Sequence, residues 1–300
     1  MTIVHLDAGS EMRGGQWQVL RLMCGLHQRG HKSILLSNKN SALHSLCHEE
    51  EGFETGRLGY RSIKRLSGEA LVHAHDARSH SIAALAYRGP LVVSRRVIFP
   101  IRRGVFSRWK YSRATLFLAV SNAVRDELLS SGIAAQRIRT VYDGVPRLAD
   151  SWEARGPVVV PWMSDPNKCM ILALEACQMS RVPVRCSPNL TQDLVGAGML
   201  VYLSRSEGLG SAALLAMAAG VPVIASDIDG LREVITHERD GLLVHNDAAV
   251  VAQAIRRLRD DADLTRRMSL SARQKIQEQF SEDRMVEETI QAYESVARAR

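Results

Sequence analysis

The sequence predicts an α/β protein of two domains, each built around a parallel sheet. The chain has 300 residues, of which 46% are hydrophobic and 24% charged, enough for two cores of about 100 to 150 residues each. Short β-rich segments alternate with helical patterns along almost the whole chain, which is typical of βαβ units. A polar stretch at 143–157, rich in glycine and proline, separates two runs of this alternation and indicates a domain boundary.

Six β-rich segments define the sheet that we expect in the first half. They are, in chain order, Thr2–Leu6, Lys32–Leu36, Leu71–His75, Leu91–Ser94, Thr115–Ser121 and Ile138–Tyr142. The first helical pattern between them is the clearest, because apolar residues recur at helical spacing after Gly14 and Gly15 as far as Leu26. Gly30 then follows as a residue that ends a helix. We predict a first Rossmann-like domain over residues 1–150.

The same alternation restarts after the polar stretch. We expect a strand at Val158–Val160, a helix near Asn167–Gln178, a strand at Leu200–Leu203, a helix at Ser211–Ala219 and a strand at Val221–Ala225. Helical patterns end the chain at Val250–Arg259, Leu264–Phe280 and Arg284–Ala297. We predict a second Rossmann-like domain over 151–280, and a C-terminal helix within 281–300 that packs back on the first domain.

Charge and cysteine content limit the classes of function. The formal net charge is +7 and the pI about 9.4, so the surface should attract anions such as sugar nucleotides, phosphorylated lipids, membrane headgroups or nucleic acid. Five scattered cysteines without a C-x-x-C pair argue against a zinc or redox motif. No apolar run reaches the roughly 18 to 20 residues that span a bilayer, and the start has no signal-peptide pattern. We therefore expect a cytoplasmic protein.

The most informative segment begins at Leu203 and reads LSRSEGLGSAALLAMAAGVPVIASDIDGLREVI. A buried strand is expected to end at Leu203, with Glu207 in the loop that follows. Gly208 and Gly210 would let the backbone approach a ligand closely before a helix starts. The free N–H groups of such a helix start suit a diphosphate. The next strand returns to the same edge of the sheet, which is where open α/β sheets bind ligands.

This segment resembles the donor-site signature of glycosyltransferase family 4, a group of retaining enzymes with the two-domain GT-B fold. Other parts of the chain are similar to the same family. Residues 13–16 (RGGQ) resemble its glycine-rich first loop, and residues 72–76 (VHAHD) its acceptor-side strand. Residues 119–121 (AVS) and 141–145 (VYDGV) resemble the end of its first domain. The resemblance covers most of the chain and implies two Rossmann-like domains with parallel sheets that face a central cleft.

The resemblance also implies roles for residues at matching positions. Glu207 matches the first glutamate of an E-x7-E motif and would hydrogen-bond the donor sugar. Lys168 stands where a family lysine holds the diphosphate. His75 falls near a family histidine at the reaction centre, with the adjacent His73 as an alternative register. The other positions expected to bind the donor are Gly14, Gly15, Gly208, Leu209, Gly210, Leu215 and Glu233.

Three departures from the family pattern concern the second domain. Leu215 occupies the position of the second glutamate of the motif, which would bind ribose hydroxyls. Trp162 occupies the position of a family arginine that would assist Lys168. The chain between Lys168 and Glu207 is short for the β-α units that the family has there, so we expect a shortened second domain.

The implied reaction moves a sugar from a UDP-, GDP- or ADP-sugar to a hydroxyl of a glycan or glycolipid, with retained configuration and without a metal or other cofactor. Synthesis of cell-surface polysaccharide or lipopolysaccharide is the expected setting. Two alternatives stay open. The departures also fit a non-catalytic GT-B subunit or carbohydrate-binding partner, and another GT-B enzyme such as a sugar-nucleotide epimerase would share the fold.

A basic segment at 95–113 contains seven arginine or lysine residues and no acid, interleaved with aromatic residues. Its central members are Arg102, Arg103, Arg108, Trp109 and Lys110. This composition fits peripheral contact with the anionic inner face of a membrane, or a phosphate-rich acceptor. It fits equally well a solvated basic face on an ordinary helix. No nucleic-acid-binding motif accompanies it, so we expect no nucleic-acid partner.

Overall fold

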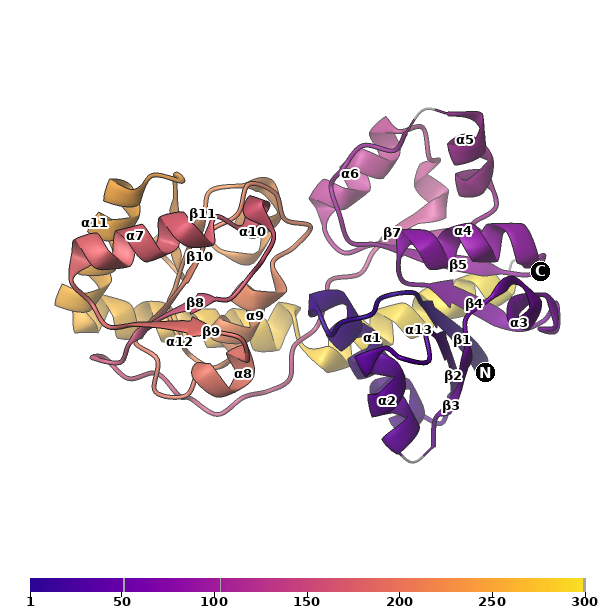
Figure 1. The fold of residues 1–300 in the computed structure, drawn as a ribbon, viewed down its shortest axis with the longest axis horizontal. Helices are drawn as coiled ribbons and strands as arrows, with labels where there is room; N and C mark the ends of the chain where they lie inside the picture. Colours follow the sequence, from indigo (N-terminus) through magenta and orange to yellow (C-terminus); the bar gives the residue numbers. More distant parts are fainter. Residues whose placement is uncertain (51, 103, 299–300) are drawn as a thin grey trace. The chain divides into compact units, whose positions relative to one another are not determined.

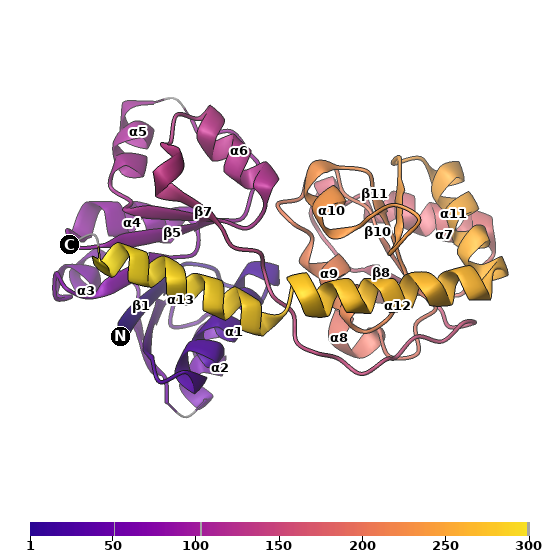
Figure 2. The same cartoon turned by 180° about the vertical axis from the view of Figure 1, so that it is seen from behind.

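The computed structural model describes residues 1–50, 52–102 and 104–298. The chain forms two compact units, shown in Figures 1 and 2. Unit 1 consists of Met1–Gly144 with Glu282–Arg300, and unit 2 of Val145–Ser281. The chain enters and leaves unit 2 at neighbouring points, because Val145 and Ser281 form an isolated parallel bridge.

Unit 1 contains a seven-stranded sheet with the order β3-β2-β1-β4-β5-β6-β7. The strands are β1 Thr2–Asp7, β2 Lys32–Ser37, β3 Glu54–Arg57, β4 Leu71–Ala74, β5 Leu91–Arg95, β6 Leu116–Ala119 and β7 Ile138–Thr140. All neighbouring pairs are parallel. The order reverses between β1 and β4, which is the Rossmann arrangement. Six of these strands match expected segments to within two residues, and β3 was not expected.

Helices pack on both faces of this sheet. They are α1 Gly14–Gln28, α2 Ala42–Glu49, α3 Tyr60–Lys64, α4 Ala77–Ala86, α5 Val105–Ser112, α6 Asn122–Ser130 and α13 Glu282–Arg298. Successive side chains of β6 show the two faces of the sheet, because neighbouring side chains of a strand point to opposite faces. Leu116 and Leu118 share a core with α1 and α13. Phe117, between them, contacts the rings of His80 in α4 and Tyr111 in α5.

Unit 2 contains a five-stranded sheet with the order β12-β11-β10-β8-β9. The strands are β8 Val158–Pro161, β9 Val184–Ser187, β10 Met199–Tyr202, β11 Val223–Ser226 and β12 Leu242–Val244, all paired in parallel. The order reverses between β8 and β10, as in flavodoxin-like sheets. β9 and β12 were not expected from the sequence.

The helices of unit 2 surround this sheet. They are α7 Met170–Ser180, α8 Leu190–Asp193, α9 Ser211–Ala218, α10 Asp229–Val234, α11 Ala248–Asp260 and α12 Ala262–Gln279. The helix expected near 167–178 is confirmed as α7 but begins three residues later, because a short 3-10 helix, η2 Pro166–Lys168, precedes it. Cys169 between them has a φ of 41°, in the left-handed region, which breaks the helical path. In α9, seven of eight residues are buried.

None of the helices formed by residues 1–50, 52–102 and 104–298 combines the length and the apolar character needed to cross a bilayer.

Close packing joins α13 to α1 within unit 1, and Gly25 allows it. A Cβ atom at Gly25 would lie 2.4 Å from Cγ2 of Val286. We predict that Gly25→Ala lowers the free energy of unfolding by about 1 to 3 kcal/mol, because the added methyl overpacks this contact. Val286→Ala in the same chain should recover part of the loss. Chemical denaturation of the full chain, followed by circular dichroism, measures both effects.

Gly59→Ala is the matched control, since nothing lies within 4 Å of a Cβ placed at Gly59. Equal losses of unfolding free energy in Gly25→Ala and Gly59→Ala would contradict this packing. So would a Gly25→Ala, Val286→Ala double variant that recovers none of the loss.

Candidate functional site

The strand order of each sheet indicates where a ligand would bind. Open α/β sheets bind ligands beyond the carboxyl ends of their strands, at the point where the order reverses. In unit 2, Lys168 follows β8 and Glu207 follows β10, the two strands at that point. In unit 1, Gly14 and Gly15 follow β1, and His75 follows β4. Each of these expected site residues therefore lies at the reversal point of its own sheet.

Lys168 and Glu207 form a shielded ion pair in unit 2. The Lys168 ammonium donates a hydrogen bond to Oε1 of Glu207. The side chain of Lys168 is 20% exposed and that of Glu207 is 9% exposed. Reduced contact with water strengthens the attraction between the two charges. Two groups that the resemblance assigns to the diphosphate and the sugar thus meet at one place.

Tyr202, the last residue of β10, is a third member that the sequence did not predict. Its hydroxyl donates to the same Glu207 oxygen at 2.6 Å, and Nζ of Lys168 lies 3.3 Å from the hydroxyl oxygen. Burial, followed by the charge of Glu207, raises the pKa of Tyr202 well above its ordinary value. The hydroxyl therefore stays protonated and donates. In the sequence, a tyrosine closing the apolar run MLVY is indistinguishable from a core residue.

The loops that carry these residues are held together by hydrogen bonds. The Asn167 carbonyl accepts from the Arg205 amide at 2.8 Å and from the Ser204 hydroxyl at 3.3 Å. Ser226 accepts from the Ser204 amide at 2.8 Å and donates to Oδ1 of Asn246 at 2.5 Å, and Asn246 donates back to the Ser204 carbonyl at 3.0 Å. The loops after β8, β10, β11 and β12 are therefore fixed to one another.

The glycines after Glu207 allow the backbone to lie close to neighbouring groups. Gly210 has a φ of 99°, which favours glycine, and α9 begins directly after it. Gly208, Leu209 and Gly210 are all buried. A Cβ at Gly230, in α10, would lie 2.3 Å from the carbonyl oxygen of Glu207. The start of α10 thus packs directly against the Glu207 loop.

The remaining predicted positions of unit 2 differ in their surroundings. Leu215 lies in α9 and is 8% exposed among apolar residues. Trp162 follows β8 and is 61% exposed, with its amide bonded to the Ser187 carbonyl at 2.7 Å. Glu233 lies on α10 and is partly buried. The position of the family's second carboxylate is therefore apolar, and that of its arginine carries an exposed indole.

In unit 1, Asp7 organises the glycine-rich loop. Its carboxylate accepts from the Gly9 amide at 2.8 Å and from the Gln16 side-chain amide at 3.0 Å. Asp76 accepts from the Ala8 amide at 2.8 Å and also caps α4. Burial raises the pKa of Asp7. The sequence did not point to Asp7 or Asp76 as loop-holding residues, because single acidic residues at strand ends are common.

Gly15 lies beside an ion pair. A Cβ at Gly15 would lie 3.6 Å from Cδ of Arg96. Arg96 itself bonds the buried carboxylate of Asp143. This arginine of the basic segment, beside Gly15, is thus already paired with an acid.

Three buried histidines lie close together: His5 on β1, His73 on β4 and His75 directly after β4. Nε2 of His75 is 3.0 Å from Nδ1 of His5. Nδ1 of His73 is 2.7 Å from the Tyr293 hydroxyl, and its Nε2 is 2.8 Å from the Ser94 hydroxyl. His73 therefore has partners at both ring nitrogens. Of the two registers left open by the sequence, His75 is the one that lies past the strand end.

This cluster offers nitrogen ligands within 4.8 Å of one another, a donor set that zinc binds. A metal ion there would have to displace Tyr293 or Ser94 from His73. Nε2 of His5 and Nδ1 of His75 are buried without a hydrogen-bond partner in the described part of the chain. The hydrogen bonds of His73 thus favour a neutral polar network over a metal site.

The basic segment is only partly exposed. Arg102 and Arg108 are exposed, and Trp109 is partly buried with its ring 5.5 Å from that of Phe106. Lys110 does not belong to this surface, because it is 9% exposed and its ammonium donates to the Ala77 carbonyl at 2.8 Å. Arg103 lies outside the described residues. α5 therefore exposes one arginine, Arg108, together with apolar side chains, and Arg102 precedes the helix.

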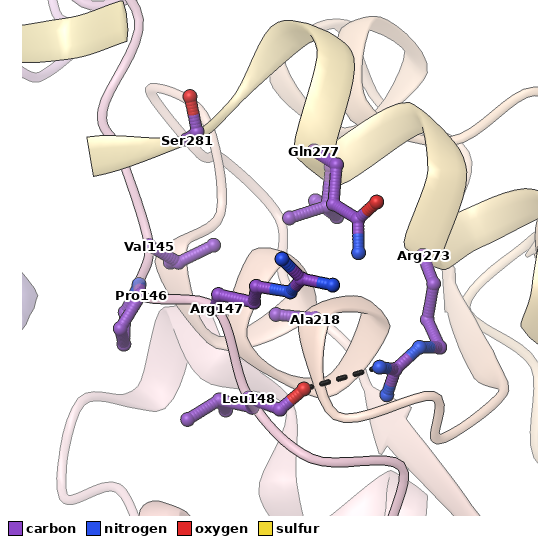
Figure 3. A pocket seen from close by; sticks show the side chains of 9 residues that line it. Val145, Pro146, Arg147, Leu148, Ala218, Arg273, Gln277 and Ser281 are labelled. Atoms are coloured by element: carbon purple, nitrogen blue, oxygen red, sulfur yellow. Dashed lines mark hydrogen bonds between the residues drawn. The ribbon is translucent and has the colours of Figure 1, made fainter. Parts of the chain in front are cut away.

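A small pocket lies where the chain enters unit 2 (Figure 3). It is lined by Val145, Pro146, Arg147, Leu148, Ala218, Arg273, Ile276, Gln277 and Ser281. Arg273 donates to the Leu148 carbonyl at 3.1 Å, as the dashed line shows. The space of about 30 Å³ has room for about two water molecules. It holds none of the predicted site residues and is too small for a nucleotide.

Comparisons with known proteins agree with this fold. Residues 12–147 match the family described as Glycosyltransferase Family 4, and residues 163–275 match Glycosyl transferases group 1. The crystal structure of Anabaena HepE in complex with UDP and glucose is similar to this chain, with a TM-score of 0.84 at 16% identity, over 98% of this chain and 100% of that one. The two units thus define a GT-B protein. The chain belongs to the family 4 glycosyltransferases.

Curated relatives match part of the chain. The alpha-maltose-1-phosphate synthase of Mycolicibacterium smegmatis is 37% identical over 116 residues, which are 36% of this chain and 30% of that protein. The lipopolysaccharide core biosynthesis glycosyltransferase LpsD of Rhizobium meliloti is 42% identical over 83 residues, which are 27% of this chain and 24% of that protein. The matches therefore span less than a third of either relative.

The buried histidines make stability depend on pH. Burial lowers the pKa of His5 to about 3, and burial and neighbouring cationic groups lower those of His73 and His75 well below the ordinary value. Unfolded histidines titrate near about 6.5. Below that pH the unfolded chain binds protons that the folded chain does not. We predict that the free energy of unfolding is largest above about pH 7 and falls toward pH 4, by up to about 1.4 kcal/mol per pH unit for each histidine.

Denaturation at a series of pH values measures this slope. His73→Gln should reduce the slope, whereas His48→Gln, which replaces an exposed histidine, should leave it unchanged. A flat profile between pH 7 and pH 5, or equal slopes in the wild type and His73→Gln, would show that the network does not control acid stability.

Proposed function

We propose that this chain is a glycosyltransferase that moves a sugar from a nucleoside-diphosphate sugar to a hydroxyl of a glycan or glycolipid, with retained configuration and without a metal. UDP-, GDP- and ADP-sugars are the candidate donors. The observation that carries this proposal is the meeting of Lys168 and Glu207 at the reversal point of the unit 2 sheet.

The chemistry of this place suits a sugar diphosphate. The Lys168 ammonium supplies positive charge for the diphosphate. α9 begins shortly after Glu207, and the first amide groups of a helix lack partners within the helix. The Glu207 carboxylate is an acceptor for sugar hydroxyls. A fixed cation and helix start of this kind stabilise a leaving diphosphate without a metal ion, because they need no rearrangement as charge develops.

Named relatives support the substrate class. HepE was crystallised with UDP and glucose, which suits a uridine donor here. The Rhizobium meliloti relative acts in lipopolysaccharide core biosynthesis, which supports a cell-surface acceptor. We place the reaction in polysaccharide or lipopolysaccharide synthesis on these grounds.

A second candidate function is a non-catalytic GT-B subunit. Two observations favour it: Leu215 leaves no carboxylate for ribose, and Trp162 is exposed where the family has an arginine. Incubation of the purified chain alone with UDP-, GDP- and ADP-sugars, with product analysis by mass spectrometry, separates the two. Transfer or hydrolysis of a sugar nucleotide excludes the non-catalytic subunit, and analysis without an acceptor also detects an epimerase.

Variants of the ion pair test the donor site. We predict that Lys168→Met weakens binding of both UDP and UDP-glucose by about 10- to 100-fold, because a charge-assisted contact with the diphosphate is lost. Glu207→Gln should weaken the binding of UDP-glucose more than the binding of UDP, and it should abolish most of the turnover. Isothermal titration measures the binding, with GDP and ADP pairs as alternative probes.

Glu238→Gln is the control, because Glu238 forms an exposed ion pair with Arg257 elsewhere in unit 2. Normal turnover in Glu207→Gln, or unchanged binding in Lys168→Met, would remove this assignment.

We also propose that α5 attaches the protein peripherally to an anionic membrane at its cytoplasmic face. Val105 is 76% and Phe106 56% exposed on this helix, beside Arg102 and Arg108. Basic side chains beside exposed apolar ones favour the interface of an anionic bilayer. The expected glycolipid acceptor would be found at the same surface.

Vesicle binding tests this surface. We predict that Arg102→Gln with Arg108→Gln weakens sedimentation with vesicles of phosphatidylcholine and phosphatidylserine by about 30-fold, since each basic residue contributes about 1 kcal/mol. Arg267→Gln, at an exposed arginine of unit 2, should bind like the wild type. Equal binding by all three proteins, or binding that does not weaken as salt is raised, would count against membrane attachment.

A further inference from the structure

Glu207 is held by two donors of different kinds. Lys168 is a cation and Tyr202 a neutral hydroxyl, and both donate to Oε1. The hydrogen bonds described for the Glu207 side chain thus end on one oxygen, and Oε2 is left for a sugar hydroxyl. Tyr202 is 4% exposed and ends a central strand, so its hydroxyl is fixed in position.

A bound donor would offer Lys168 a second partner. A diphosphate carries more negative charge than one carboxylate, so it would draw the ammonium away from Glu207. A buried carboxylate that loses its cation without another partner is strongly destabilised. The Tyr202 hydroxyl has no net charge and is not drawn to the diphosphate. It therefore remains on Glu207 when Lys168 moves.

We propose that Tyr202 is a positioning residue of the donor site, which keeps the Glu207 carboxylate in place for the donor sugar while Lys168 turns to the diphosphate. This inference rests on the proposed function. It adds that recognition of the sugar depends on the Tyr202 hydroxyl, whereas recognition of the diphosphate does not.

Neighbouring contacts support a fixed ring. A Cβ at Gly210 would lie 3.6 Å from Cε1 of Tyr202 and 2.5 Å from Cδ2 of Leu231. The ring therefore packs against the backbone at the start of α9. Nζ of Lys168 lies 5.6 Å from the centre of the ring, so the lysine can leave Glu207 and stay over the aromatic face.

Tyr202→Phe removes the hydroxyl and keeps the ring. We expect it to weaken UDP-glucose binding about tenfold, as for a lost hydrogen bond to a charged group, and UDP binding less than twofold. Titration of the full chain with UDP and with UDP-glucose gives the ratio of the two affinities. The GDP or ADP pair replaces these probes if the wild type prefers it.

Two further variants make the comparison sharp. Tyr87→Phe removes a buried hydroxyl of unit 1 that donates to the Ala70 carbonyl, and it should leave the ratio unchanged. Tyr202→Leu also lacks the hydroxyl and is the second test if Tyr202→Phe does not fold. Thermal melting of each variant identifies any general loss of stability.

The outcomes separate the inference from the function on which it rests. Selective loss of UDP-glucose affinity in Tyr202→Phe supports the positioning role. Equal weakening of UDP and UDP-glucose, or no weakening of either, overturns it, because a purely structural tyrosine would not distinguish the two ligands. Absence of binding of every sugar nucleotide by the wild type would overturn the proposed function as well.

Discussion

Reversal of strand order in a parallel sheet is the constraint on which the predicted site residues of each unit depend. Parallel pairing brings the carboxyl ends of neighbouring strands to one edge. β8 and β10 pair through Val158 with Met199, so the loops after them lie together. Lys168 and Glu207, which are 39 residues apart in the sequence, meet for this reason. In unit 1 the pairing of β1 with β4 brings His5 opposite His73, and it places His75 beside the end of β1, where its amide donates to the Leu6 carbonyl at 3.0 Å.

Folding stability alone does not account for the Lys168–Glu207 pair. Removing two charges from water is unfavourable, and their attraction offsets this loss only when geometry and further hydrogen bonds are good. Tyr202 supplies one such bond, and the Ser204–Ser226–Asn246 network fixes the loop that carries Glu207. An apolar pair would suit folding alone equally well. Charged groups at the carboxyl ends of the strands, on loops fixed by hydrogen bonds, support the proposed binding of a charged ligand.

Most of the fold could be predicted because buried parallel strands read as short apolar runs. The strands that were missed share one physical feature. β3 is an edge strand of unit 1, and β9 and β12 are the two edges of unit 2. An edge strand is covered less completely, so its sequence needs fewer apolar residues, as in β3 (ETGR) and β9 (VRCS). β12 is apolar, but its three residues (LLV) form too short a run to predict a strand. The break at Cys169 was missed for another reason, since a left-handed residue other than glycine has no strong sequence signal.

Only those site residues that belong to a recognisable sequence motif could be predicted. Lys168 and Glu207 were expected from family positions, but the direction of a side chain is set by its three-dimensional neighbours. Lys110 is an example. Its ammonium donates a hydrogen bond to the Ala77 carbonyl, so it does not lie on the basic surface that the composition predicted. Tyr202 is the converse case, a residue that reads as core and donates to a carboxylate.

Leu215 shows that a departure from a family pattern can follow from packing. It lies in α9, where the residues from Ala212 to Ala218 are all buried. A carboxylate introduced there would have to lose its water, which is unfavourable by roughly several kcal/mol unless a partner compensates it. The absence of a carboxylate at position 215 therefore follows from the apolar packing of α9. A donor held in unit 2 would be recognised mainly through its diphosphate and sugar, by Lys168 and Glu207 at the loop ends, and less through its ribose.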